Sequence, residues 1–179
     1  MDFSTDYAGR VTAIADLFAA VFTASEGAAE GAVIGQLASE MLTPGGAEGL
    51  LVCLAIDGNE LAGAVMFSPL HYRDDPTKVA LLSPMAIATA HHGKGLGQSL
   101  IRYGLEQLRA RNFAEVLTNG DINFYAKTGF EPVTQAQAQA PFPLQYPQGW
   151  LGRSLTDAPF TALHGPSTCA HALSKPEYW

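Results

Sequence analysis

A glycine-rich loop, HHGKGLG at residues 91–97, separates two segments of opposite periodicity. Residues 79–88 (VALLSPMAIA) form an apolar run of strand length. After the loop, apolar residues return at helical spacing until about Arg111. These residues are Leu96, Leu100, Ile101, Leu105 and Leu108. A strand that enters a helix through a glycine turn predicts a mixed α and β protein.

The loop has the composition of a phosphate-binding turn. Glycine lets the backbone turn sharply and approach a ligand closely. The first N–H groups of the following helix lack intrahelical partners and suit an anion, and Lys94 adds a positive charge. A dinucleotide fingerprint is excluded because the sixth residue from Gly95 is Leu100, and a Walker A loop because Lys94 is followed by glycine. We therefore expect another phosphate-bearing ligand, although a plain glycine-rich turn is the simpler interpretation.

The rest of the chain also reads as one α+β domain spanning residues 1–179. Two amphipathic helices are predicted at 8–22 and 33–42, with a Gly/Ala-rich link at 27–31 between them. The runs 50–56 and 61–70, joined by DGNE, predict a β-hairpin. Further predictions are a strand at 114–118, a short helix at 122–128 that Gly129 ends, and weaker strands at 150–155 and 168–173.

Two residues inside these elements predict local irregularity or close packing. Pro84 lies within the 79–88 strand and cannot donate to the ladder, so we expect a bulge or a splayed strand there. Gly104 lies within a helix, where glycine costs about 1 kcal/mol relative to alanine, so we expect a close contact with a neighbour.

Composition narrows the class of protein. The chain is 47% hydrophobic and 15% charged, as in ordered globular proteins, and its formal net charge of -7 argues against nucleic-acid binding. No apolar run reaches the ~20 residues of a membrane span, and the polar start is unlike a secretory signal. Cys53 and Cys169 read as packed thiols. The adjacent pair His91 and His92 is not expected to bind a metal, because adjacent side chains point apart. We expect a cytoplasmic protein.

A second motif, YAKTGF at residues 125–130, follows one helix and one strand later. With it, the pattern H-x-x-G-x-G, helix, strand, Y-x-x-x-G-F resembles the GNAT superfamily of N-acetyltransferases, whose pattern usually begins with Gln or Arg where this chain has His92. The segment GDINFYAKTGF (residues 120–130) is most similar to YhbS-type acetyltransferases. The resemblance is specific from Leu82 to Val133 and looser elsewhere.

The resemblance implies a fold and a ligand. It implies a GNAT-like, mixed but mostly antiparallel twisted sheet with helices on both faces and a splayed central strand pair. It implies acetyl-CoA as cosubstrate and no metal. The strand before the loop would bind the pantetheine arm and the loop the pyrophosphate. The implied cofactor-binding residues are Met85, Ala86, Ile87, His92, Gly93, Lys94, Gly95, Leu96, Gly97 and Gln98.

Within this family Tyr125 would protonate the departing thiolate. The chemistry agrees, since a phenol with a reference pKa near ~10 is protonated at neutral pH. Backbone N–H groups freed near Pro84 could stabilise the oxyanion. The general base is left open among Asp121, His71, Ser83 and a water chain, because the 79–88 strand carries no carboxylate.

The expected reaction is direct attack of a primary amine, on a small molecule or a protein, upon the thioester. The expected partners include neither nucleic acid nor membrane, and a homodimer is plausible from the family. The absence of a strand carboxylate, together with His92, leaves one alternative: an inactive CoA-binding or regulatory module. A nucleotide-binding protein is a third.

Overall fold

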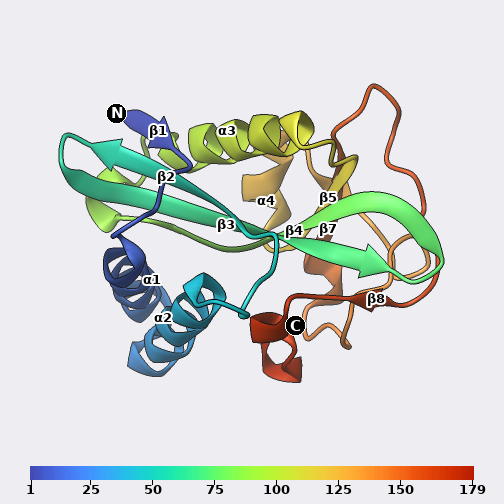
Figure 1. Ribbon diagram of the computed structural model, residues 1–179, viewed down its shortest axis with the longest axis horizontal. Coiled ribbons are helices and arrows are strands. Elements are labelled where there is room, and N and C mark those ends of the chain that lie inside the picture. The colour runs from blue at the N-terminus through green and yellow to red at the C-terminus, as the bar shows by residue number, and fades with distance from the viewer.

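The computed structural model describes residues 1–179 and contains one eight-stranded sheet (Figure 1). The strand order is β1-β2-β3-β4-β5-β7-β6, and β8 pairs with one end of β3. Only β4 and β5 pair in parallel, so the sheet is mixed and mostly antiparallel. The strands are β1 (Asp2–Ser4), β2 (Leu51–Asp57), β3 (Glu60–Tyr72), β4 (Asp75–Ile87), β5 (Glu115–Asn119), β6 (Glu131–Pro132), β7 (Trp150–Ser154) and β8 (Ser167–Thr168).

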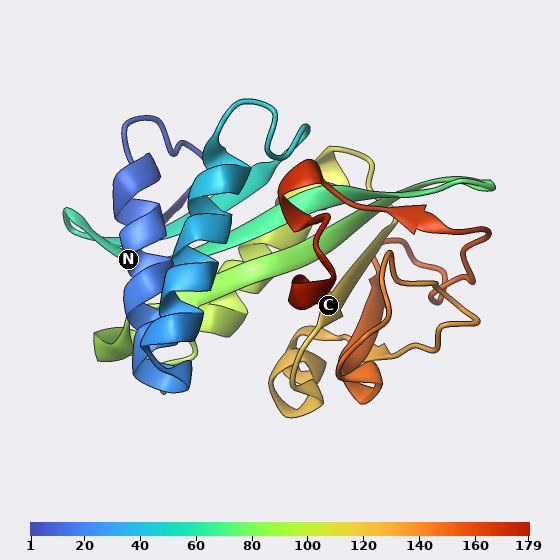
Figure 2. The same ribbon diagram turned by 90° about the horizontal axis from the view of Figure 1, so that it is seen from below.

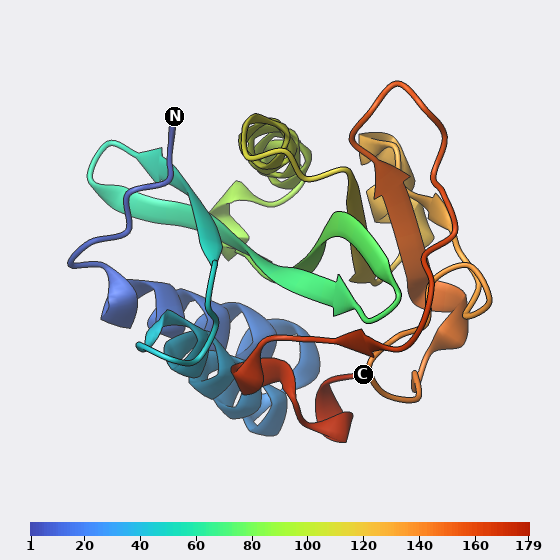
Figure 3. The same cartoon turned by 45° about the vertical axis from the view of Figure 1, so that its right-hand side comes forward.

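Helices cover both faces of this sheet, as predicted. Figure 3 shows α1 (Val11–Glu26) and α2 (Ala28–Leu42) on one face and α3 (Leu96–Ala110) on the other. The short α4 (Ile122–Tyr125) lies on the α3 side. In Figure 2 the C-terminal segment lies next to α2, on the α1/α2 face. Short 3₁₀ helices lie at Thr89–His91, Ala126–Thr128, Pro147–Gly149, His171–Leu173 and Pro176–Tyr178.

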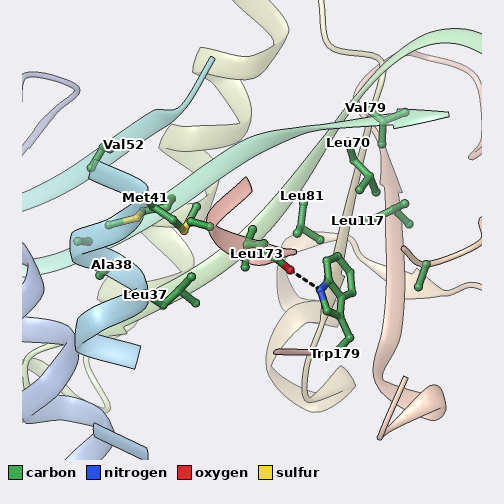
Figure 4. Packing of buried hydrophobic residues seen from close by; sticks show 14 of the residues in the cluster. Leu37, Ala38, Met41, Val52, Leu70, Val79, Leu81, Leu117, Leu173 and Trp179 are labelled. Carbon is green, nitrogen blue, oxygen red and sulfur yellow. Dashed lines mark hydrogen bonds between the residues drawn. The ribbon is translucent and has the colours of Figure 1, made fainter. Parts of the chain in front are cut away.

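The two faces enclose two separate hydrophobic clusters. Alternate residues of a strand point to opposite faces, and β4 shows this: Leu81 packs in the α1/α2 cluster and Leu82 in the α3 cluster. Figure 4 shows part of the first cluster, which includes Leu81, Leu117, Leu173 and Trp179. The indole of Trp179 donates to the Leu173 carbonyl at 2.9 Å. The C-terminal segment is therefore part of the core on this face.

The parallel strands β4 and β5 separate part-way along their length. Their register ends at the pair Leu81 and Leu117, whereas β4 continues to Ile87. On its other side, β4 has one extra residue relative to β3 around Ser83 and Pro84. The predicted bulge at Pro84 and the splayed strand pair are thus confirmed.

The first two helices are longer than predicted, and the expected link between them is mostly helical. Gly27, with φ of 102°, is the only residue between α1 and α2. Gly31 and Gly35 lie inside α2 and face α1. A Cβ on Gly31 would lie 1.9 Å from Thr23 Oγ1, and a Cβ on Gly35 would lie 2.8 Å from Ala19 Cβ. The Gly/Ala-rich composition marks a close helix–helix contact, which composition alone does not distinguish from a linker.

Other boundaries also differ from the predictions. The turn between β3 and β4 contains only Arg73 and Asp74, so β4 begins at Asp75, four residues before the predicted strand at 79–88. The predicted strand at 168–173 was wrong beyond Thr168, because His171–Leu173 form a 3₁₀ helix that packs on α2. The short edge strands β1 and β6 were not predicted, since two or three residues carry no readable alternation. No helix is long and apolar enough to cross a bilayer.

Gly104 has the close contact that its place in a helix predicted. A Cβ on Gly104 would lie 2.3 Å from the Phe67 ring and 3.5 Å from Cys53 Sγ. Cys53 itself is buried as a free thiol, and burial raises its pKa to about 12. Cys169 is also a free thiol and is partly buried.

Candidate active site

A cleft lies where the end of β4, the glycine loop, α3 and α4 meet. Its volume is about 580 Å³. It is lined by Val21, Phe22, Met85, Ala86, Ile87, His91, His92, Gly93, Gly95, Leu96, Gly97, Gln98, Phe124, Tyr125 and Lys127. The structure thus brings nine of the ten predicted cofactor-binding residues and Tyr125 to one cleft.

The glycine loop exposes backbone donors to this cleft. Gly93 and Gly95 have φ of 73° and 74°, a left-handed conformation that side chains with a Cβ rarely adopt. The first intrahelical bond of α3 runs from the Ser99 N–H to the Gly95 carbonyl at 3.1 Å. The N–H groups of Leu96, Gly97 and Gln98 precede this bond and are free to bind an anion.

The tenth predicted residue, Lys94, points elsewhere. Its ammonium donates to the Ala90 carbonyl at 2.9 Å, and its side chain lines a neighbouring hollow beside Phe3. His92 lines the cleft, and its Nε2 lies 2.7 Å from the Ile87 carbonyl. His92 therefore joins the loop to the end of β4. The Nε2 atom of His91 lies 3.9 Å from Oδ2 of Asp57.

The charge of the cleft favours an anionic ligand. Lys127 is the one Lys, Arg, Asp or Glu residue in the lining, so no carboxylate opposes a phosphate there. Lys127 was missed by the sequence reasoning, although it stands inside the YAKTGF motif. Val21 and Phe22, which close the cleft from α1, were also missed, because nothing in a helical stripe shows which end faces a ligand.

The ring of Tyr125 is held firmly beside the cleft. It meets the rings of Phe124 and Phe130 edge to face, with centroid separations of 5.1 and 5.5 Å. Gly120 lies against it so closely that a Cβ there would be 2.5 Å from the Tyr125 ring. Burial raises the pKa of the Tyr125 phenol, while the neighbouring hydroxyl of Thr118 lowers it by a smaller amount. The phenol is therefore kept protonated at neutral pH.

Thr118 connects this phenol to the separating strands. It is 1% exposed, and its hydroxyl donates to the Leu82 carbonyl at 2.9 Å, just beyond the last registered pair of β4 and β5. Tyr125 therefore lies at the point where the two strands part.

The three candidate bases are placed differently. The Asp121 carboxylate caps α4, accepting from the Asn123 N–H at 2.9 Å. His71 is exposed and pairs with β8, where it lines a hollow with Tyr72 and Lys78. Ser83 lines a second cavity next to the strand separation. The structure thus brings only Ser83 of the three to the strand separation.

This second cavity opens on the other face of the sheet and has a volume of about 210 Å³. Leu81 and Asn119 line it, whereas their neighbours Leu82 and Thr118 face the α3 side, because adjacent strand residues point to opposite faces. The Asn119 amide nitrogen is positioned to donate to the carbonyls of Tyr146 and Gly149, both at 3.2 Å. The two cavities thus approach the strand separation from opposite sides.

No group of three or more His, Cys, Asp or Glu side chains is arranged to hold a metal ion. A cleft that combines free backbone donors, one lysine and a protonated phenol, with no carboxylate in its lining, is suited to a phosphate-bearing ligand. The family follows from the sequence comparison. Residues 11–130 match the acetyltransferase (GNAT) family, so the chain belongs to this family of N-acetyltransferases.

Individual relatives agree with this assignment. The chain is 30% identical over 140 residues to an uncharacterized N-acetyltransferase, YjhQ, of Escherichia coli K12, covering 75% of this chain and 77% of that one. The crystal structure of E. coli YhbS in complex with CoA superimposes with a TM-score of 0.71 at 22% identity, covering 91% and 88% of the chains. A GNAT acetyltransferase from Brucella melitensis, in complex with acetyl-CoA, gives 0.65 at 18% identity, covering 94% of both chains. These structures share the fold of this chain.

Proposed function

We propose that this protein transfers an acetyl group from acetyl-CoA to a primary amine. The observation that carries the proposal is that free backbone donors and a protonated phenol line one cleft. The complexes of YhbS with CoA and of the Brucella enzyme with acetyl-CoA, on the same fold, support this choice of donor.

The cleft residues divide between two parts of the substrate. The N–H groups of Leu96, Gly97 and Gln98, with Lys127 beside them, would hold the pyrophosphate. The backbone of Met85 and Ala86 would bind the pantetheine arm along β4, because β4 loses its partner β5 there. Ile87 would contribute through its side chain, since His92 occupies its carbonyl.

The reaction needs a neutral amine, a stabilised oxyanion and a protonated leaving group. The amine nitrogen forms a bond to the acetyl carbon, the carbon–sulfur bond breaks, and the Tyr125 hydroxyl gives its proton to the sulfur. Ser83 and Pro84 have no registered partner on β3, which leaves backbone near the bulge available to the oxyanion. Holding both substrates in line contributes up to roughly 7–11 kcal/mol to such reactions.

Thermal shift and a thiol-release assay test this proposal together. We expect CoA to raise the melting temperature, because CoA at one hundred times its Kd adds about 3 kcal/mol to the free energy of unfolding. ATP and NAD should leave the melting temperature unchanged. Acetyl-CoA with a panel of primary amines should release free thiol. Stabilisation by CoA without turnover of any amine would indicate a CoA-binding module, and stabilisation by ATP or NAD alone would indicate a nucleotide-binding protein.

A further inference from the structure

The second cavity is built by two chain segments that are bonded to each other. One wall contains Gln145 and Tyr146, and the other contains Glu177, Tyr178 and Trp179. The Gln145 N–H donates to the Trp179 carbonyl at 2.8 Å, and its side-chain nitrogen donates to the Glu177 carbonyl at 3.4 Å. The second cavity is also lined by Leu81, Ser83 and Asn119, which lie at the strand separation. The cavity is therefore part of the folded structure and not a gap between loose segments.

The charge of this lining is opposite to that of the main cleft. Glu177 is its one charged side chain, and it contains no Lys, Arg or His. The chain as a whole carries a formal net charge of -7. A cation is attracted to such a site, and a ligand carrying its own carboxylate or phosphate is repelled.

The remaining walls are aromatic and rigid. Trp179 is 5% exposed, its indole donates to the Leu173 carbonyl, and it meets Trp150 edge to face at 6.2 Å. Tyr146 is 55% exposed at the rim. The Tyr178 ring already lies 5.7 Å from the ammonium of Lys175, which is a cation–π geometry. Because Lys175 already engages the Tyr178 ring, the rings of Tyr146 and Trp179 are the aromatic surfaces left for the apolar body of a ligand.

The cavity volume limits the ligand further. About 210 Å³ is below the 300–1,000 Å³ usual for drug-sized ligands. It suits one ring with a short chain. A polyhydroxylated polyamine sugar would exceed this volume and would find one carboxylate for its several charges.

From these observations we propose that the acceptor is a compact arylalkylamine without an anionic group, bound in this cavity with Glu177 as the partner of its ammonium. This inference rests on the transferase function proposed above. Glu177 takes one proton from the ammonium and later releases it to solvent. The neutral nitrogen then attacks the thioester through the strand separation, and Tyr125 protonates the sulfur. The amide nitrogen gives up its second proton to the Tyr125 phenolate, so each turnover releases one proton.

The acceptor class is tested with 2-phenylethylamine against phenylalanine, spermidine, kanamycin and a lysine-containing peptide. We expect kcat/KM for 2-phenylethylamine to exceed that of each of the others by at least about tenfold, the ratio that 1.4 kcal/mol produces. Phenylalanine isolates the carboxylate, because it differs from 2-phenylethylamine only by that group. In the presence of CoA, 2-phenylethylamine should also change the fluorescence of the neighbouring pair Trp150 and Trp179, which reports binding at this cavity independently of turnover.

The role of Glu177 is tested with Glu177→Gln and the matched control Glu106→Gln, which removes an exposed carboxylate on α3. Glu177→Gln should lower kcat/KM for 2-phenylethylamine by about 10²-fold, within the usual range for a proton acceptor, and shift its pH profile to higher pH. With 2,2-difluoro-2-phenylethylamine, which has a similar shape but a less basic amine, the loss should fall below about tenfold. Glu106→Gln should change neither kcat/KM for the two amines nor the pH profile.

The outcomes separate this inference from the function beneath it. Faster turnover of phenylalanine, spermidine, kanamycin or the peptide overturns the acceptor class while leaving the transferase proposal in place. An equal loss with both phenylethylamines, or no loss, overturns the role of Glu177. Stabilisation by CoA without turnover or fluorescence change for any amine overturns the transferase proposal, and this inference with it.

Discussion

At the scale of single residues, Tyr125 combines confinement with a raised pKa. Its ring is fixed between Phe124, Phe130 and Gly120, and burial favours the neutral phenol. A rigid, protonated phenol costs little reorganisation when it donates a proton, and this is what a general acid requires.

Replacing Tyr125 with phenylalanine should therefore remove the proton donor and leave the packing intact. We expect kcat to fall by about 10²–10⁴-fold, with CoA stabilising the variant as it stabilises the parent. Steady-state kinetics and thermal shift measure the two quantities. Unchanged turnover would show that Tyr125 only closes the cleft. Tyr103→Phe, on the exposed side of α3 against Phe3, is the matched control.

Glu115 carries a second buried ionisable group and lines neither of the two cavities. It is 4% exposed, one carboxylate oxygen accepts from the Thr161 N–H, and the other has no partner. Burial raises the pKa of Glu115 above its ordinary value of 4.5. The folded state therefore favours the protonated carboxyl, and stability present below about pH 4.5 is lost as pH rises through the folded-state pKa.

Glu115→Gln should cancel this loss, because the amide oxygen can still accept from Thr161 and carries no charge. The free energy of unfolding of the variant should exceed that of the parent by an amount that grows from pH 4.5 to pH 7.5. Urea denaturation at several pH values measures this difference. A difference that shrinks as pH rises would contradict the assignment.

At the scale of elements, α3 is positioned by its closest contact with the sheet. Gly104 permits this contact, since Phe67 of β3 occupies the space of its missing side chain. This packing fixes the start of α3, and so the free N–H groups of the cleft, relative to β4.

The substitution Gly104→Ala has two opposite effects on the free energy of unfolding. Helix propensity would stabilise the variant by about 1 kcal/mol, but overpacking of a buried site costs typically 1–3 kcal/mol. A Cβ 2.3 Å from the Phe67 ring makes the second effect larger, so we expect net destabilisation by up to about 2 kcal/mol. Denaturant titration measures it. The double variant with Phe67→Leu should recover part of the loss, and a stabilised single variant would show that α3 moves freely.

At the scale of the whole molecule, two separate cavities lie near the point where β4 and β5 part. The main cleft lies between the end of β4, α3 and α4 and is closed by Val21 and Phe22 of α1, whereas the second cavity is lined by Leu81, Ser83 and Asn119 together with the C-terminal segment. On the function proposed above, acetyl-CoA and the amine would occupy separate cavities, so both could be bound before the acetyl group is transferred and no acetylated enzyme would be needed.

This arrangement predicts sequential kinetics. Varying acetyl-CoA at several fixed amine concentrations should give intersecting double-reciprocal lines, because both substrates are bound before transfer. Parallel lines, the pattern of a ping-pong mechanism through a covalent intermediate, would contradict it. Initial-rate measurements with 2-phenylethylamine distinguish the patterns.

The sequence alone determined the glycine loop, the helix after it, the Pro84 bulge, the family and most of the cleft. These features are local: glycine conformation, apolar periodicity and a missing proline N–H act within a few residues. Helix boundaries near Gly27 were predicted less well, because Gly31 and Gly35 serve contacts with α1 that periodicity does not reveal.

Only the tertiary structure decided what lies opposite the cleft. Glu177 and Trp179 are about sixty residues beyond Thr118 and Asn119 in the chain, and no spacing rule connects them. They reach the strand separation because the C-terminal segment buries Leu173 and Trp179 against the sheet. Likewise, Lys94 carries the expected charge in the expected loop, but a backbone carbonyl holds it away from the cleft. Long-range packing, which sequence periodicity cannot encode, sets these positions.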